Sequence, residues 1–510
     1  MDFAGAYLRK AGLRDTLIEA EPHPGLEIIV TIPVYNEPGL ERCLDSLFLC
    51  ETGGGDDPGG GVPDGDGPDG DNPDGGVPDG GVPDGDAPIH AEVIILINAP
   101  ADAPAEILET NLRTRDEVLA WINAHPHPHI KFHLLLDHSF KRKEAGVGMA
   151  RKILMDEAAR RFDRIGRPEG IIASMDADVV VEQSYLSALV NHFRTRRPEG
   201  DAVYPDGCSV YFEHPLTGEE FSPDIYEAIT RYELHLRYYL QSLRSTSYPY
   251  AYHTLGSSFA VSAEVYCREG GMNRRQGGED FYFIQKIAQR GNFSECNDTC
   301  VRPSPRPSDR VPFGTGPAVA RQLRGTFFPP APGPGQPADP SARISTQGNT
   351  LLTYAPEPFR MLAGLFDGME ILYSGVCLDH YIKARPGVLL AFLEKQGFGE
   401  ALVEIRRNSA SPGSFRKRFW RWFNMFRIMK FLHFARKNGY PDIPVEQAAC
   451  EFLALWKAGE SGNPGDRTDE EQAACEFQVS RGQEGSGTDP AVLLEIYRRI
   501  DRFRRDTARR

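Results

Sequence analysis

The first 175 residues alternate short apolar stretches with longer amphipathic ones, and this alternation restricts the folds open to the chain. Four apolar stretches read as buried strands: 26–35, 91–99, 130–137 and 170–175. Segments with helical spacing of apolar residues separate them: 39–50, 103–125 and 146–162. Strands that alternate with helices indicate an α/β fold with a parallel, doubly wound sheet. In such sheets ligands bind at the carboxyl ends of the strands.

A tandem repeat interrupts this pattern between the first two expected strands. Residues 51–88 contain a proline at every fifth position from Pro58 to Pro88 and five copies of Pro-Asp-Gly. These residue types favour turns, and almost no side chain here can enter a core, so ordering the segment would cost entropy without burial. We predict a disordered surface insertion. Calcium binding by the repeated aspartates is the alternative.

The composition changes again after the expected sheet. Residues 302–350 are rich in Pro, Gly and Arg, whereas the sequence from 351 onward is mainly helical in pattern. We therefore expect four parts: an N-terminal helical extension (1–24), an α/β domain (25–310), a Pro/Gly-rich loop and linker (311–350) and a C-terminal, mainly helical region (351–510).

The charge and cysteine content set limits on location and partners. The formal charge is −15, but residues 51–88 hold eleven acidic and no basic residues, so the remainder is close to neutral. No global positive field favours nucleic acid. The nine cysteines are scattered, and no apolar run approaches the roughly 18 residues of a membrane-spanning helix. We expect reduced thiols, no signal peptide and a cytoplasmic protein.

Two aspartates, Asp176 and Asp178, follow the fourth expected strand in the stretch "SMDADVVV". Two negative charges at the edge of a core need a partner. A divalent cation provides one, because Mg²⁺ and Mn²⁺ prefer carboxylate oxygens and can in turn hold a diphosphate. A helix N-cap beside a solvated aspartate is the alternative interpretation of such a pair.

Three motifs in order resemble those of glycosyltransferase family 2. They are "TIPVYNEPGLERCLDSL" (31–47), "SMDADVVVEQSYLSALVNHF" (174–193) and "QGGEDFYFIQKIAQRG" (276–291). The residues that carry the resemblance are Pro33, Tyr35, Asn36, Glu37, Asp176, Asp178, Glu279 and Asp280. The likeness covers roughly residues 25–310. It implies the GT-A fold, a Rossmann-like architecture whose mostly parallel sheet is flanked by helices.

The resemblance also implies roles for these residues. Pro33, Tyr35 and Glu37 would line the base and ribose of a nucleoside diphosphate sugar. Asp176 would approach the ribose or the metal, and Asp178 would bind the Mn²⁺ or Mg²⁺ that bridges the phosphates.

The third motif would supply the catalytic base. Asp280, next to Glu279, would deprotonate the acceptor hydroxyl. Acidic residues also suit the first turn of any helix, but the preceding Gly277-Gly278, which lets backbone approach a ligand closely, favours a site.

The chain departs from the family pattern at two positions. Asn98, at the end of the second expected strand, stands where the family usually has an acidic residue that contacts the base, so the resemblance does not imply specificity for uracil. Arg151 lies where the family often has a Gly-Lys pair. Arg151 could reach the nucleotide or could be an ordinary solvated helix residue.

Further candidates lie downstream. Arg302, Arg306 and Arg310 follow the third motif on a proline-rich loop, and guanidinium groups suit phosphate oxygens. A solvated basic loop is the alternative. Because some GT-A enzymes use a downstream histidine as a metal ligand, His253 is a candidate, although an ordinary loop histidine would look the same.

The segment 415–440 interleaves basic and aromatic residues in a helical pattern. Such a helix could make peripheral contact with an anionic membrane, where a lipid-linked acceptor would be found. The favoured interpretation is instead that its aromatic face docks on the catalytic domain while the basic heads reach solvent.

These observations predict a metal-dependent glycosyltransferase of the hexosyltransferase class. It would move a sugar from a nucleoside diphosphate sugar to an acceptor hydroxyl with inversion, and Asp280 would be the general base. The acceptor could be a glycan, a lipid-linked or a small molecule. A phosphatase of the haloacid-dehalogenase type is one alternative, because "MDADVV" also fits its Asp-x-Asp motif. A non-catalytic GT-A scaffold or glycan-binding protein is the other.

Overall fold

The computed structural model describes most of the chain. The described residues are 3–11, 16–53, 87–142, 145–195, 204–275, 277–311, 314–324, 343–344, 350–457 and 489–503. Most of the Pro-Asp-Gly repeat (54–86) and most of the expected linker lie outside these ranges, so the prediction of a disordered insertion is not tested.

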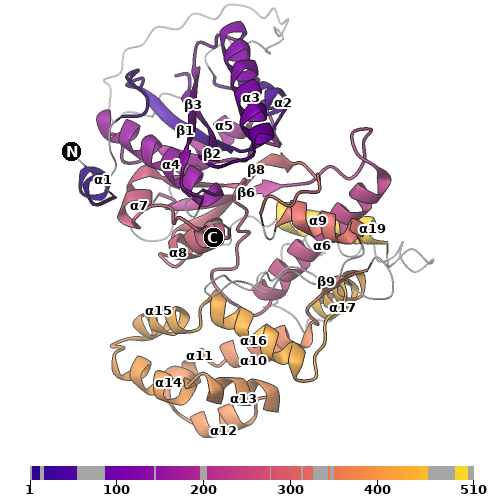
Figure 1. The fold of residues 1–510 in the computed structure, drawn as a ribbon. Coiled ribbons are helices and arrows are strands. Elements are labelled where there is room, and N and C mark those ends of the chain that lie inside the picture. Colours follow the sequence, from indigo (N-terminus) through magenta and orange to yellow (C-terminus); the bar gives the residue numbers. More distant parts are fainter. Residues whose placement is uncertain are drawn as a thin grey trace, which may run out of the picture.

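An eight-stranded sheet forms the centre of the molecule (Figure 1). Its strands, in spatial order, are β3 (Ile130–Phe140), β2 (His90–Pro100), β1 (Leu26–Val34), β4 (Ile171–Ser174), β7 (Phe259–Ser262), β6 (Gly207–Phe212), β8 (Phe293–Pro303) and β5 (Val179–Val181). Neighbours from β3 to β4 are parallel, as are β6 and β8, whereas β7 and β5 run antiparallel to their neighbours. The predicted α/β fold with a mostly parallel sheet is confirmed.

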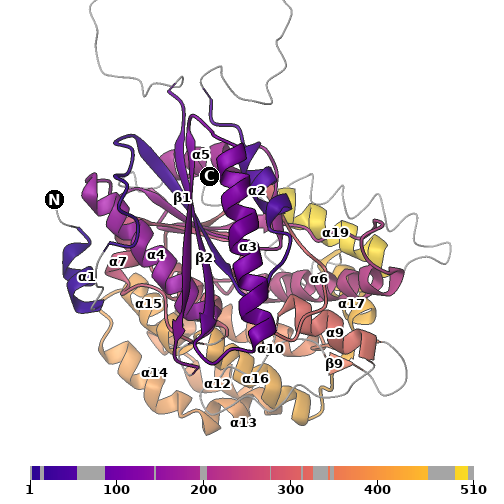
Figure 2. The ribbon, with the colours of Figure 1, turned by 45° about the horizontal axis from the view of Figure 1, so that its top comes forward.

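Successive side chains of β1 point to opposite faces of the sheet, and each face packs against a different set of helices. Ile28 and Val30 face one apolar core, and Ile29 faces the other. The first core is completed by helices α2 (Glu41–Phe48), α3 (Ala105–Ala124) and α5 (Tyr185–Arg194). The second is completed by α4 (Val147–Arg164), α7 (Ala263–Arg268) and α8 (Glu279–Ala288). Figure 2 shows α3 and α4 on either side of β1 and β2.

The order of the strands predicts where a ligand would bind. From β1 the chain builds outward through β2 to β3 and then returns to the other side of β1 to form β4. Val30 of β1 lies between Val93 of β2 and Ala173 of β4. At such a reversal the loops leaving the carboxyl ends of two neighbouring strands diverge and leave a crevice, which is where open α/β sheets bind ligands. The loops concerned begin after Val34 and Ser174.

Short N-terminal and long central helices complete this part of the chain. Helix α1 (Gly5–Ala11) lies in the expected N-terminal extension and contacts α4, where the Tyr7 hydroxyl donates to Asp156 over 2.6 Å. Helix α6 (Pro223–Arg244) connects β6 with β7 and extends away from the sheet (Figure 1).

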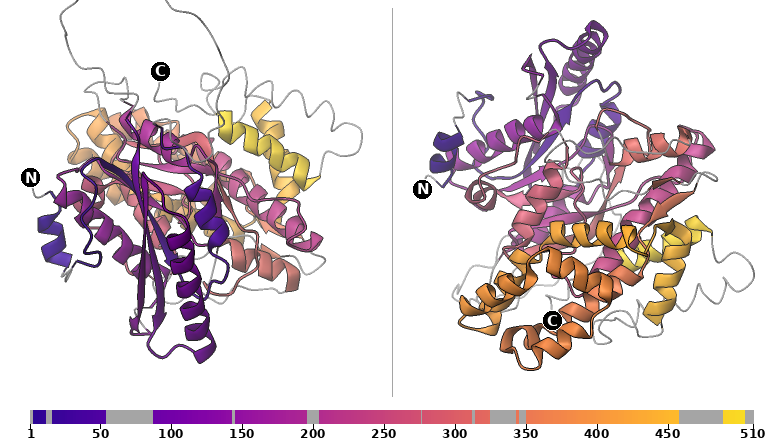
Figure 3. Two further views of the ribbon diagram at one scale, coloured as in Figure 1. Left: turned by 90° about the horizontal axis from the view of Figure 1, so that it is seen from above. Right: turned by 60° about the horizontal axis from the view of Figure 1, so that its bottom comes forward.

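The C-terminal region is mainly helical where it is described, as predicted. Its elements are α10 (Glu357–Phe366), α11 (Met369–Ser374), α12 (Leu378–Lys383), α13 (Gly387–Lys395), α14 (Phe398–Arg407), α15 (Pro412–Trp422), α16 (Met425–Lys437), α17 (Val445–Lys457) and α19 (Pro490–Phe503), with the short strands β10 (Leu351–Thr353) and β11 (Ile443–Pro444). Strand β9 (Arg343–Ile344), in the expected linker, pairs with β10. Figure 3 shows α10 to α16 grouped on one side of the sheet.

Two segments differ from the expectation or refine it. The predicted loop and linker contains a helix, α9 (Thr315–Arg324), because its apolar residues, among them Ala318 and Val319, are buried against α6. The segment 415–440 forms two helices, α15 and α16, and its aromatic residues Phe415 and Phe419 are fully buried in the helical region. No helix in the described parts of the chain is both long and apolar enough to cross a membrane.

Candidate functional site

Five carboxylates meet at the carboxyl ends of β1 and β4, where the reversal of strand order predicts a crevice. Glu37 follows β1, Asp176 and Asp178 follow β4, and Glu279 and Asp280 begin helix α8. The parallel pairing of β1 with β4 brings the first three together. Asp176 and Asp178 keep 39% and 31% of their side-chain surface exposed, so a ligand in the crevice can reach them.

Arg151 of α4 joins two of these motifs. Its guanidinium donates to Asp176 through Nη2 and to Glu279 through Nη1, and both Arg151 and Glu279 are almost fully buried. Gly256 makes room for this side chain, since a Cβ at that position would lie 2.7 Å from Nη2 of Arg151. From the sequence, Arg151 could have been a residue of the site or a solvated helix residue. The structure places it inside the site as a buried ion-pair partner.

Arg306 joins two further carboxylates, those of Glu37 and Asp178. Its Nη1 lies 2.7 Å from Oε1 of Glu37, and its Nη2 lies 2.5 Å from Oε2 of Glu37 and 3.2 Å from Oδ2 of Asp178. Arg310 donates to the same Glu37 over 2.7 Å and to the carbonyl oxygen of Tyr35 over 2.9 Å. Of the three arginines suggested for phosphate binding, Arg306 and Arg310 therefore lie at the crevice, whereas Arg302 forms an ion pair of 2.6 Å with Glu182.

The pairing of β5 with β8 explains how the arginine loop arrives there. These strands run antiparallel, with Val179 opposite Pro303, and the Ser304 amide donates to the Asp178 carbonyl over 3.1 Å. The chain leaving β8 must therefore pass the Asp176–Asp178 turn. Arg306 comes three residues after the end of β8, which places it over Asp178.

The two carboxylates that share Arg306 have opposite pKa shifts. Burial raises the pKa of Asp178 to about 6, and the charges of Asp176 and Glu37 add to the rise. Burial alone would also raise the pKa of Glu37, but hydrogen bonds and charge from Arg306 and Arg310 hold that pKa below its ordinary value. Near pH 6 Glu37 is thus a fixed charge, while Asp178 changes its protonation state.

The candidate base lies in a similar environment. Burial raises the pKa of both Glu279 and Asp280, although Arg151 opposes the rise. Asp280 accepts a hydrogen bond from the Phe281 amide over 2.7 Å. Gly278 takes φ of +68° just before α8, a left-handed conformation that glycine adopts at little cost. A raised pKa suits a carboxylate that must accept a proton.

Two residues that the sequence reading missed hold the loop after β1. Asn36 has φ of +51°, and its amide donates to Oδ1 of Asn111 on α3 over 2.9 Å. The Thr114 hydroxyl donates to the Glu37 carbonyl over 2.9 Å. Asn111 and Thr114 are fully buried. Asn111 and Thr114 are polar residues on the inward face of α3, and this unusual position could have indicated their role from the sequence.

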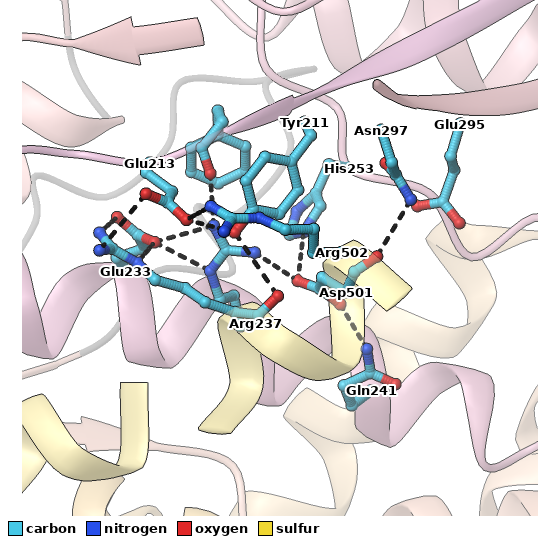
Figure 4. Close-up of polar contacts among 12 residues, drawn as sticks. Tyr211, Glu213, Glu233, Arg237, Gln241, His253, Glu295, Asn297, Asp501 and Arg502 are labelled. Atoms are coloured by element: carbon cyan, nitrogen blue, oxygen red, sulfur yellow. Dashed lines mark hydrogen bonds and ion pairs between the residues drawn. The ribbon is translucent and has the colours of Figure 1, made fainter. Parts of the chain in front are cut away.

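The remaining candidates have varied surroundings. Pro33 and Tyr35 are half-buried at the end of β1. Asn98 is buried near the end of β2 and pairs in register with Asp137 of β3. His253 lies beside the ring of Phe212, and its Nε2 is 3.3 Å from Oδ2 of Asp501 on α19 (Figure 4). Its predicted role as a metal ligand stays a prediction.

The crevice offers carboxylate oxygens that suit a hard divalent cation. Within the described ranges no group of three or more His, Cys, Asp and Glu side chains is arranged to hold a metal ion. Mg²⁺ commonly uses one or two carboxylates and takes its other ligands from water and substrate phosphates. Asp178 with Asp176 fits that donor set, whereas Glu37 is occupied by two arginines.

This arrangement can bind a cation and a polyanion side by side and can accept a proton at the beginning of α8. The carboxylates supply the cation ligands, and Arg306 and Arg310 can turn to phosphate oxygens. No family model matches the chain, and no curated protein matches its sequence.

Proposed function

We propose that the protein is a metal-dependent glycosyltransferase whose α/β domain is of the GT-A type and whose donor is a nucleoside diphosphate sugar. The observation that carries the proposal is the balance of charge at the crevice. Five carboxylates face three guanidinium groups, those of Arg151, Arg306 and Arg310. When all five carboxylates are ionised, the site has a net charge of −2, and one Mg²⁺ or Mn²⁺ ion would neutralise it.

The donor would lie across the carboxyl ends of β1 and β4. Asp178 and Asp176 would hold the cation, and when bound the cation would neutralise charge on the departing diphosphate. Arg306 and Arg310 would leave Glu37 for the phosphate oxygens, because a guanidinium fork pairs with phosphate as well as with carboxylate. Pro33, Tyr35 and Asn98 would then line the nucleoside.

The proton transfer would fall to Asp280. Its raised pKa makes it a stronger base than an ordinary aspartate, and the Phe281 amide donates to its carboxylate. The acceptor oxygen would attack the sugar carbon from the face opposite the diphosphate, so a single displacement would invert the anomeric configuration. General-base catalysis of this kind is worth about 10²–10⁴-fold in rate.

Helix α8, which carries the candidate base, packs against the helical region. Tyr282 of α8 stacks on Phe426 of α16 with ring centroids 4.7 Å apart, and Phe281 meets the same ring edge-on. This contact supports docking of the 415–440 segment on the α/β domain. A hydroxyl of a glycan, a lipid-linked sugar or a small molecule would react in the same way at this position.

A panel of nucleoside diphosphate sugars with Mn²⁺ tests the proposal through release of free nucleoside diphosphate. We expect turnover of at least one donor by the wild-type protein. Asp178→Asn should reduce turnover by about 10²-fold or more, because the cation loses its charged ligand. Asp116→Asn, at an exposed aspartate of α3, is the matched control and should retain full activity.

The outcomes separate the three candidate functions. Failure of every donor to react, or normal turnover by Asp178→Asn, would refute the proposed mechanism. Release of inorganic phosphate from a phosphoester without any sugar transfer would support a phosphatase. Normal donor binding with no turnover would support a non-catalytic glycan-binding protein.

A further inference from the structure

The central sheet has one long free edge, formed by β3. This strand is the last in the spatial order on its side and pairs only with β2 in the part of the chain that the structure describes. It has eleven residues and no proline, whereas β5, at the opposite end of the sheet, has three residues. A strand with one neighbour leaves a row of N–H and C=O groups without a strand partner, and proteins usually shorten, cover or charge such an edge. The length of β3 therefore needs an explanation.

The side chains of β3 are apolar for an edge strand. Leu134, Leu135 and Leu136 follow one another at its centre. Leu134 and Leu135 are half-buried, and Leu136 is 38% exposed. In the neighbouring strand β2, by contrast, every residue from Ala91 to Ala99 is buried. The free edge thus carries apolar surface that the chain itself leaves in contact with solvent.

Helix α3 adds to this surface. It covers one face of β3, where the ring of Trp121 packs edge-on against Phe132 with the centroids 5.0 Å apart. Leu112 and Leu119 of the same helix keep 37% and 44% of their surface exposed. They lie about two helical turns apart and so share one side of α3. Figure 2 shows α3 running alongside the strands in this part of the sheet.

The charges of β3 are placed symmetrically about Leu134. Lys131 comes three residues before it, and Asp137 comes three residues after it. If two copies paired antiparallel about a twofold axis at Leu134, each Lys131 would lie opposite the partner's Asp137, and each Phe132 would lie opposite the partner's Leu136. Opposite charges and apolar side chains that face each other across two strands stabilise the pair. The strand is therefore complementary to a second copy of itself.

We propose that β3 is the dimer interface of this protein, and that two copies pair antiparallel about Leu134 to form one continuous sheet. Such a twofold pairing is closed, because it uses the same edge of both copies and leaves no long edge free. The two α3 helices would lie on the same face of the joined sheet, so Leu112 and Leu119 would face the neighbouring copy. Because β1 and β4 run parallel to β3, the two crevices would lie at opposite ends of the joined sheet. The inference does not depend on the proposed function.

A charge swap tests the register. Lys131→Asp places two aspartates at each contact with the partner's Asp137, and Asp137→Lys places two lysines there. We expect the wild-type protein to sediment as a dimer at micromolar concentrations and each variant to have a dimer dissociation constant about tenfold higher or more, because like charges opposite each other are destabilising. An equimolar mixture of the two variants should form dimers again, since every contact then joins a lysine to an aspartate. The mixture also controls for the hydrogen bonds that Ser139 donates to Asp137, which stay lost in it.

A matched pair of leucine variants tests the apolar part of the interface. Leu136→Lys places a charge against the partner's Phe132 and should give a monomer with an unchanged circular dichroism spectrum. Leu323→Lys on α9 is the control, because Leu323 is also 38% exposed, and it should remain a dimer. Amide hydrogen exchange of the β3 peptide should be as slow in Leu323→Lys as in the wild type and faster in Leu136→Lys.

The outcomes decide the proposal without any measurement of turnover. A wild-type protein that is monomeric at tens of micromolar would overturn it. A dimer that survives Leu136→Lys and both charge variants would also overturn it, because the interface would then lie elsewhere. If the charge variants dissociate and their mixture does not form dimers, the pairing about Leu134 is wrong. Each result stands whether or not the protein transfers a sugar.

Discussion

Asp178 and Glu37 share one arginine but hold their protons with very different strength. Arg306 and Arg310 both contact Glu37, whereas only Nη2 of Arg306 reaches Asp178. Asp178 also faces the negative charge of Asp176, which Glu37 largely escapes through its two arginines. The carboxylate proposed to bind the cation is therefore the one that titrates near neutral pH.

Cation binding should depend on pH through Asp178. Since its pKa is raised to about 6, the carboxylate is protonated below that pH and must lose the proton before it can bind a cation. We expect the affinity for Mn²⁺, measured by isothermal titration calorimetry, to rise up to about tenfold per pH unit between pH 5 and 6 and to level off above 7. Asp178→Asn should bind more weakly with a flatter profile. An affinity that does not change from pH 5 to 8 in the wild-type protein would contradict this assignment.

Some of these residues were predictable from sequence and others were not. Asp176 and Asp178 follow an apolar stretch of strand length, so the sequence predicted that they lie at the carboxyl end of a strand. The ion pair between Arg151 and Glu279 joins residues 128 positions apart, and no local pattern encodes such a contact. Asn111 and Thr114 act on a loop that precedes them by about 75 residues, so their role also depends on tertiary packing.

At the scale of elements, the pairing of β5 with β8 brings the loop that carries Arg306 and Arg310 into the candidate site. The sequence predicted that Arg306 and Arg310 lie on a proline-rich loop after the third motif, and the pairing of β5 with β8 brings this loop to the crevice. The same reading treated the following residues as linker, although α9 packs on α6. Helix α9 has only ten residues and follows a Pro- and Gly-rich stretch, and a helix this short depends on packing against a neighbouring surface.

Arg306 should weaken binding of the cation, because it competes for Asp178, and should strengthen binding of the nucleoside diphosphate. Removing its charge in Arg306→Gln frees Glu37 and Asp178 from a positive neighbour, so Mn²⁺ affinity should rise by about fivefold, or about 1 kcal/mol. The affinity for the nucleoside diphosphate should fall by about tenfold or more, because a charged hydrogen bond to phosphate is worth about 1.5–3 kcal/mol.

Opposite changes in two binding constants make this prediction specific. Both affinities are measured by calorimetry, the diphosphate in the presence of saturating Mn²⁺. Arg302→Gln is the control, because Arg302 pairs with Glu182 and contacts none of the candidate site residues. A loss of both affinities in Arg306→Gln would mean that Arg306 supports the shape of the crevice and does not compete for it.

At the scale of the whole molecule, α6 joins the sheet to both groups of C-terminal helices. One part of α6, including Ile229 and Leu234, packs in a core with α9, α17 and α19. Leu240 and Leu243, near its end, lie in the core of α10 to α16. Figures 1 and 3 show this helix between the sheet and the helical region. The sequence predicted the helical content of this region but carried no information about which surface of the α/β domain it covers.

Arg237 is the residue of α6 on which this assembly depends most. It is fully buried, and it donates to Glu233 over 2.9 Å, to Asp501 of α19 over 2.6 Å and to the Phe212 carbonyl. Replacing it with Met keeps much of its volume and leaves Asp501 and Glu233 with fewer positive partners in a buried place. Removing one partner of a buried ion pair costs about 3–5 kcal/mol, since the remaining charge cannot be solvated.

Arg237→Met should therefore lower the free energy of unfolding by about that amount, measured by urea denaturation and helical circular dichroism. The matched control is Arg499→Met on α19, whose pair with Glu495 is exposed and spaced four residues apart. Such a pair contributes about 0.3–0.5 kcal/mol, so the control should unfold almost as the wild type does. Equal midpoints for the two variants would mean that the apolar contacts of α19, among them Leu494 and Tyr497, hold the helix in place without the charge network.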